Sequence, residues 1–139
     1  MTISSWIVPN ELGTVCLKDA CIIKGAELYE LQGPDENRKL VFDEILSGEL
    51  EAGKPYLFNA TATGRISFYN KVKAAHTETA SSLKGMYGTF EDITFSPATD
   101  QNIYYFSGHS IWAVKKNTAD VVLPAYLCYV KMDEFLASP

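Results

Sequence analysis

Asn102–Lys116 reads NIYYFSGHSIWAVKK and contains the clearest structural signal in the chain. Two runs rich in aromatic and β-branched residues flank Ser107–Ser110, a stretch whose glycine suits a tight turn. This pattern predicts a β-hairpin. Because side chains alternate between the two faces of a strand, Tyr104 and Phe106 should share one face and Tyr105 the other.

Segments of the same kind recur along the chain, and Gly, Pro, Asp or Asn separates most of them. The further strands predicted on this basis are 13–18, 26–32, 38–46, 55–60, 65–70, 88–95 and 126–132. Many short strands with turn residues between them are typical of all-β sandwiches and barrels. We therefore predict an all-β fold, a two-sheet antiparallel β-sandwich (jelly-roll-like) of about eight to ten strands.

The stretch 71–83, KVKAAHTETASSL, does not fit the strand pattern. Val72, Ala75, Thr79 and Leu83 have roughly helical spacing, but the apolar stripe is thin and four of the last seven residues are Ser or Thr. The sequence predicts a long middle loop on the surface, with room for one turn of helix.

Length and charge narrow the function classes. The 139 residues suit one domain, predicted to span residues 1–139. Seventeen acidic against twelve basic residues give a net charge of −5, which argues against a nucleic-acid partner. No apolar run approaches the roughly 18 residues of a membrane span. Met1–Asn10 lacks the pattern of a signal peptide.

The three cysteines, Cys16, Cys21 and Cys128, are odd in number and have spacings unsuited to a zinc site. Two of them lie in apolar strand segments, where a thiol behaves as a small buried hydrophobe. We expect buried thiols without a disulfide.

Other motifs resemble catalytic patterns only in part. Gly48–Lys54 matches the start of a phosphate-binding loop, but Pro55 opens a strand where that loop needs a hydroxyl residue and a helix. We therefore expect a turn in which the glycine before Lys54 has a positive φ and Lys54 itself is solvated. His76 is expected to be a solvated loop residue, and His109 a turn residue. Adjacent carboxylates on a strand point to opposite faces, so such a pair cannot act jointly on one bond. Because none of these patterns is complete, the sequence predicts no enzyme and no metal or other cofactor.

A resemblance adds to these patterns. GELEAGKPYLF, residues 48–58, resembles the L-x-A-G-x-x-Y-L segment of β-rich modules, often C-terminal, in Bacteroidetes surface and secreted proteins. The looser matches are 13–17, 25–29, 83–85, 88–90 and 123–127. This resemblance implies an extracellular or cell-surface location and an adhesive or glycan-related role.

The aromatic residues of the hairpin are the candidate ligand or interface residues, namely Trp112, Tyr104 and Tyr105. Exposed flat rings are surfaces on which sugars and partner proteins pack. We expect Trp112 to be buried, which favours a non-catalytic accessory or adhesion-type module of a bacterial surface or secreted protein. The alternative is a glycan-binding module associated with a carbohydrate-active enzyme. For the two candidate functions, the expected partners are domains of a parent chain or surface glycans.

Overall fold

The computed structural model describes residues 2–7, 12–60, 64–71, 73, 75–107 and 110–137. This part of the chain forms fifteen strands, one 3-10 turn and one short α-helix, and each of the strand pairings is antiparallel. The prediction of an all-β fold is therefore confirmed.

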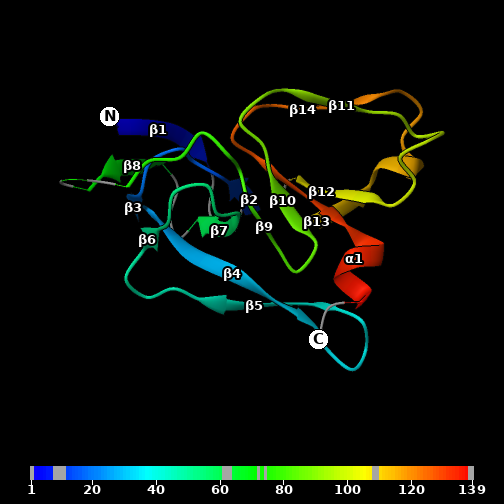
Figure 1. The fold of residues 1–139 in the computed structure, drawn as a ribbon, viewed down its shortest axis with the longest axis horizontal. Helices are drawn as coiled ribbons and strands as arrows, with labels where there is room; N and C mark the ends of the chain where they lie inside the picture. The colour runs from blue at the N-terminus through cyan, green and yellow to red at the C-terminus, as the bar shows by residue number, and fades with distance from the viewer. Residues whose placement is uncertain are drawn as a thin grey trace.

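The strands form four sheets (Figure 1). The first has the order β1 (Thr2–Ile7), β8 (Gly64–Asn70), β3 (Cys21–Lys24), β6 (Glu49–Leu50). The second has the order β2 (Leu12–Val15), β7 (Tyr56–Ala60), β4 (Ala26–Pro34), β5 (Leu40–Glu44). The third has the order β13 (Ser110–Ala113), β12 (Ile103–Ser107), β15 (Cys128–Lys131), β10 (Met86–Gly88), β9 (Ser82–Leu83). The fourth pairs β11 (Ile93–Phe95) with β14 (Val121–Leu123).

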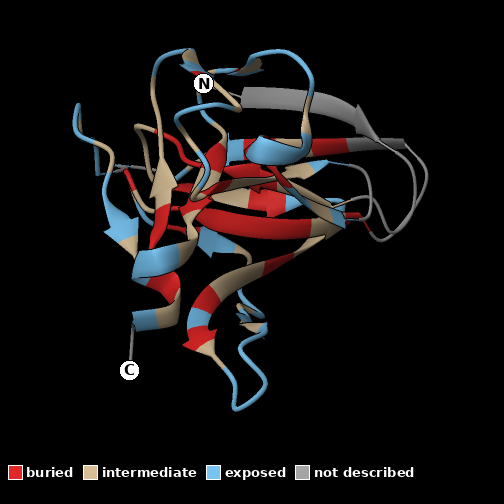
Figure 2. Cartoon of the chain, turned by 90° about the vertical axis from the view of Figure 1, so that its right-hand side faces the viewer, coloured by how far each residue is buried: buried red, intermediate tan, exposed pale blue. Residues whose placement is uncertain are grey.

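Three hydrophobic clusters join successive sheets. Cluster 1 joins the first and second sheets and includes Ile23 and Leu28. Cluster 2 joins the second and third sheets and takes in Leu31 and Phe135, the latter from helix α1 (Met132–Ala137). Cluster 3 joins the third and fourth sheets around Val114. Figure 2 shows the buried residues along the central strands and the exposed ones mostly at the periphery.

The grouping of the strands differs from the predicted two-sheet sandwich of eight to ten strands. Leu28 and Leu31 of β4 belong to different clusters, so this strand contributes side chains to two separate parts of the core. Five of the fifteen strands have only two or three residues, namely β6, β9, β10, β11 and β14. Segments this short are below the length at which alternation can be recognised in a sequence.

The predicted hairpin is present as β12 and β13, with Ser107 opposite Ser110. Gly108 and His109, the centre of the predicted turn, lie outside the described residues. Tyr104 and Phe106 pack against cluster 2 while Tyr105 packs against cluster 3, as the alternation predicted. The second strand ends earlier than expected, because the chain turns into the 3-10 segment η1 (Val114–Lys116).

The predicted middle loop is also confirmed for the described residues of 71–83. They contain no helix. Apart from strand β9, their β-structure is an isolated β-bridge between His76 and Asp19. Within the described residues, no helix is long and apolar enough to cross a membrane.

Candidate functional site

The first candidate site is a surface on the β12–β13 hairpin, which we call the Trp112 surface: Trp112, Tyr105, Ser107 and Ser110. Trp112 lies directly opposite Tyr105, and Ser110 lies opposite Ser107. Residues directly opposite in an antiparallel pair present their side chains on the same face. One aromatic pair and two exposed serines therefore share a face at the edge of the third sheet.

Trp112 is 51% exposed, so the expectation that it is buried is wrong. Its strand, β13, is the last in the third sheet and pairs with β12 alone among the described strands. A ring on such an edge has neighbours on one side only, which leaves the other side to solvent. The indole is nevertheless held in place, because Nε1–H donates to the carbonyl oxygen of Ser107 at 3.1 Å.

Tyr104 and Tyr105, the other two predicted aromatic residues, are partly buried. Tyr104 packs against cluster 2, on the opposite face from Trp112. Tyr105 packs against cluster 3, and its hydroxyl accepts a hydrogen bond from Nδ2 of Asn117 at 3.1 Å. The same amide nitrogen donates to the carbonyl of Ala113 at 3.2 Å, which connects Tyr105 to the end of β13. The structure therefore brings Tyr105 and Trp112 together and separates Tyr104 from them.

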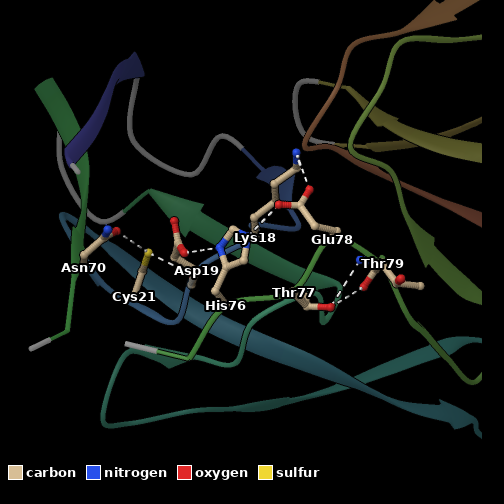
Figure 3. Close-up of polar contacts among 8 residues, drawn as sticks. All are labelled: Lys18, Asp19, Cys21, Asn70, His76, Thr77, Glu78 and Thr79. Atoms are coloured by element: carbon tan, nitrogen blue, oxygen red, sulfur yellow. Dashed lines mark hydrogen bonds and ion pairs between the residues drawn. The ribbon is translucent and has the colours of Figure 1, made fainter. Parts of the chain in front are cut away.

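The second candidate site is a group of four charged side chains, the His76 cluster: Lys18, Asp19, His76 and Glu78 (Figure 3). Nδ1 of His76 lies 2.5 Å from Oδ1 of Asp19, and its Nε2 lies 2.7 Å from Oε1 of Glu78. Nζ of Lys18 lies 2.9 Å from the other oxygen of Glu78. The imidazole is thus placed between two carboxylates.

Backbone hydrogen bonds position this cluster. The amide of Ala20 donates to the carbonyl of Ala75, and the amide of Thr77 donates to the carbonyl of Lys18, at 2.9 and 2.8 Å. These bonds hold the middle loop against the segment between β2 and β3. His76 is an exposed loop residue, as expected, with a side chain that is 49% exposed. The expectation missed its two carboxylate partners, because one of them, Asp19, lies 57 residues away in the sequence. The spacing of His76 and Glu78 was the one feature of the local sequence that pointed to this cluster.

The charges of the cluster shift one another's pKa values. Hydrogen bonds to Glu78 and then to Asp19 raise the pKa of His76 above its usual value. The bonds from His76 and Lys18 lower the pKa of Glu78. The pKa of Lys18 is raised, chiefly by its hydrogen bond to Glu78. Glu78 therefore stabilises the charged forms of His76 and Lys18, and these two stabilise the charged form of Glu78.

A mostly apolar cavity of about 210 Å³ adjoins the cluster. Its lining residues are Leu17, Lys18, Asp19, Cys21, Phe68, Asn70, His76 and Tyr126. A second cavity of about 240 Å³ shares Leu17, Phe68 and Tyr126 with the first. His76 forms part of the wall of the first cavity and also of a more polar hollow.

Cys21 lies beside the cluster, but its surroundings do not activate it as a nucleophile. Its thiol donates to the carbonyl of Asp19 at 3.2 Å and lies 3.3 Å from Oδ1 of Asn70. Burial, with a smaller contribution from the charge of Asp19, raises the pKa of this thiol. A cysteine nucleophile needs a lowered thiol pKa and a base that can take its proton. Both nitrogens of His76 are already occupied by carboxylates.

The other two thiols are also held in the protonated form. Cys16 and Cys128 are fully buried in cluster 2. Burial raises the pKa of Cys16 to about 12 and raises that of Cys128 as well. All three cysteines are unbonded to one another. In the described residues, no group of three or more His, Cys, Asp or Glu side chains is arranged to hold a metal ion.

The segment resembling a phosphate-binding loop is a turn between β6 and β7, as predicted, and a strand follows it. Gly53 has a φ of 74°, which confirms the expected positive value. The expectation that Lys54 is solvated is wrong. Its Nζ lies 2.6 Å from Oε2 of Glu30 and 3.2 Å from Oε2 of Glu51, and its side chain is 25% exposed. Lys54 neutralises these glutamates and so is already paired.

Comparisons with known proteins identify no relative. No protein-family model matches the chain, and neither curated proteins nor solved structures include a match.

Proposed function

We propose that this chain is a non-catalytic, adhesion-type or accessory module of a bacterial surface or secreted protein, and that it contacts its partner through the Trp112 surface. The burial of Trp112 that was expected to favour this role over glycan binding is absent from the structure. The observation that carries the proposal is instead the half-exposed indole of Trp112, which its hydrogen bond to Ser107 holds on an edge strand as a contact surface. Tryptophan is enriched among the residues that dominate binding energy, because it offers a large area at a small entropic cost. A ring already held in place loses little further freedom on binding.

The state of the reactive groups supports a non-catalytic role. The thiols have raised pKa values, and the imidazole of His76 is shared between two carboxylates. Lys54 is likewise paired with two glutamates. The charges of His76 and Lys54 therefore serve neighbouring carboxylates, and the thiols of Cys21 and Cys128 bond to backbone carbonyls.

A glycan-binding module is the second candidate function, favoured by the polar groups beside Trp112. The hydroxyls of Ser107 and Ser110 share the face of the indole, as does the Tyr105 ring. Carbohydrate sites commonly combine an aromatic surface with a few hydrogen-bonding groups that fix orientation. The surface therefore has the components that a sugar ring requires.

The test uses a Trp6→Phe background, so that tryptophan fluorescence reports Trp112 alone. We expect red-shifted emission that acrylamide quenches readily. The labelled chain is then incubated with bacterial cells and with a panel of soluble polysaccharides, alongside a Trp112→Ala variant. Tyr69→Ala, which removes an exposed aromatic ring on β8, is the matched control.

Loss of cell binding in Trp112→Ala but not in Tyr69→Ala would support the adhesion-type proposal. A change in Trp112 emission on adding a polysaccharide, together with loss of cell binding after periodate treatment, would select the glycan-binding candidate. Cell binding that is lost after protease treatment of the cells but survives periodate treatment would indicate a protein partner. Equal cell binding by Trp112→Ala and the unaltered chain would overturn the role of this surface.

A further inference from the structure

Two apolar cavities lie side by side next to the His76 cluster, and none of their described lining residues belongs to the Trp112 surface. Leu17, Phe68 and Tyr126 line both cavities, which measure about 210 and 240 Å³. An apolar cavity of about 150 Å³ is enough to bind benzene. Small-molecule sites commonly have apolar and aromatic walls and a few polar groups that fix the orientation of the ligand. The size and lining of the two cavities therefore suit a mostly apolar ligand.

Charged side chains are confined to one end of this pair of cavities. Lys18, Asp19 and His76 line the first cavity, and none of the described residues that line the second is charged. The second cavity has walls such as Phe58 and Ile66. A molecule that lies along the three shared side chains would therefore meet charged groups at one end and apolar groups at the other. This arrangement matches an amphiphile, a molecule with a polar head group and an apolar chain.

The charges of the His76 cluster balance one another. Both ring nitrogens of His76 lie within hydrogen-bond distance of carboxylate oxygens, one from Asp19 and one from Glu78. Because a carboxylate only accepts hydrogen bonds and a neutral imidazole has a single N–H, two such contacts fit the imidazolium. With Lys18 on Glu78, the cluster then has two cations and two anions. A charged head group would leave one charge without a counterion beside an apolar cavity, which is unfavourable, so an uncharged head group fits best.

We propose that the two cavities bind a single-chain amphiphile with an uncharged head group, namely an alcohol of about eight carbons. Its apolar chain lies along Leu17, Phe68 and Tyr126, where it covers apolar surface that water otherwise contacts. Its hydroxyl lies beside Asp19, whose Oδ1 bonds to His76. The second carboxylate oxygen of Asp19 is turned away from the imidazole (Figure 3) and accepts a hydrogen bond from the hydroxyl.

The backbone of Tyr126 supports a ligand site at this position. Its φ is 70°, a left-handed conformation that is unusual for an aromatic residue and that glycine adopts without strain. Its amide donates to the carbonyl of Thr89 at 2.7 Å, and its carbonyl accepts from the amide of Cys16 at 2.9 Å, so the conformation is fixed on both sides. Residues held in such conformations cluster at ligand sites. The ring is 39% exposed and lines both cavities, so it lies where a ligand enters.

The test compares three probes that have the same chain and differ in head-group charge: 1-octanol, octylammonium and octanoate. Each is titrated into the full chain at about pH 6, below the usual histidine pKa, so that His76 carries its charge. Amide chemical shifts in NMR spectra give the affinity of each probe. Nuclear Overhauser effects between the probe chain and the rings of Phe68 and Tyr126 locate it.

We expect saturable binding of 1-octanol with contacts to Phe68 and Tyr126, and binding of the two ions that is weaker by about tenfold or more. Each methylene removed from the alcohol should weaken binding by about two- to fourfold, because it leaves apolar surface uncovered. Absence of saturable octanol binding, contacts confined to another part of the chain, or an ion that binds as tightly as octanol would overturn the proposal. The titration of the unaltered chain decides the matter even if a variant folds poorly.

Two variants test the chain and head-group positions separately. Tyr126→Gly removes the shared ring without opposing the backbone conformation, and it should weaken octanol binding by about fivefold or more. Lys84→Gly is the matched control, because Lys84 also has a positive φ, 54°, but lines neither cavity. Lys18→Gln leaves one negative charge unbalanced, so octylammonium should gain about two- to fivefold relative to octanoate. Equal octanol affinity in the two glycine variants, or an unchanged preference between the ions in Lys18→Gln, would contradict the proposed placement.

Discussion

Trp112 stands directly opposite Tyr105 on the neighbouring strand, yet Tyr105 packs into cluster 3 whereas the Trp112 ring is half exposed. The two residues share a face, so the difference comes from their strands: β12 is flanked by β13 and β15, and β13 lies at the sheet edge. The position of its strand within the sheet therefore determines whether an aromatic ring is packed in the core or exposed to a binding partner.

This difference predicts unequal effects on stability. Trp112→Ala should lower the free energy of unfolding by about 1 kcal/mol or less, because its exposed side loses little packing. Tyr105→Ala should cost about 2–4 kcal/mol, since it leaves a cavity and removes the partner of Asn117. Urea denaturation of both variants measures the two values. A larger loss in Trp112→Ala than in Tyr105→Ala would contradict the burial described above.

Any side chain at Gly53 should lower the free energy of unfolding. Its φ is 74°, and an added Cβ would lie 2.7 Å from Cγ2 of Thr77 and 2.8 Å from the carbonyl oxygen of Thr79. Gly53→Ala should therefore cost about 1–3 kcal/mol and lower the melting temperature by roughly 3 °C or more. Gly48→Ala is the comparison, because its φ is 69° but its nearest neighbour would lie 3.2 Å away. An equal effect at both positions would mean that φ alone, without the contacts to Thr77 and Thr79, sets the cost.

Lys54 should contribute to stability, contrary to what its turn position suggests. Burial lowers the pKa of Lys54, but hydrogen bonds to Glu30 and Glu51 outweigh this effect and leave the pKa raised. Lys54→Ala should cost about 1 kcal/mol, since it leaves the partly buried Glu30 without its cation. Lys71→Ala, which breaks a more exposed pair with Glu49, should cost almost nothing. A double-mutant cycle with Glu30→Ala measures the pair, and a coupling near zero would show that Lys54 acts alone.

The thiols should be protected by the fold. Cys16 and Cys128 are fully buried and Cys21 is nearly so, and burial raises the pKa of each. A thiol reagent such as DTNB should therefore react slowly with the native chain and with three groups after denaturation. Three rapid reactions in the native state, or a single reaction after denaturation, would contradict this arrangement.

Much of the fold could be read from local patterns. The strong alternation of Tyr104, Tyr105 and Phe106 correctly assigned these rings to opposite faces. The turn that follows β4 is also local, because Oδ1 of Asp35 accepts hydrogen bonds from the amides of Asn37 and Lys39 at 2.8 and 2.9 Å. Such features depend on residues close together in the chain, so a short window of sequence is enough to recognise them.

The candidate sites were less predictable. Trp112 was recognised as a candidate residue, but its exposure depends on which strand ends the sheet, and strand order is a property of the whole third sheet. The His76 cluster depends on Asp19, from a segment far from His76 in sequence. A loop histidine without partners and one that lies between two carboxylates have the same local sequence.

By itself, then, the sequence determined the β character, the faces of the alternating strands, the positive φ of Gly53 and the burial of the thiols. The tertiary structure decided that the strands stack as four sheets, that the ring of Trp112 stays at an open edge, and that His76 lies between two carboxylates. The physical reason is the range of the interactions. Backbone preference and side-chain alternation act between near neighbours, whereas sheet order and ion pairing depend on which distant segments bury their apolar faces together.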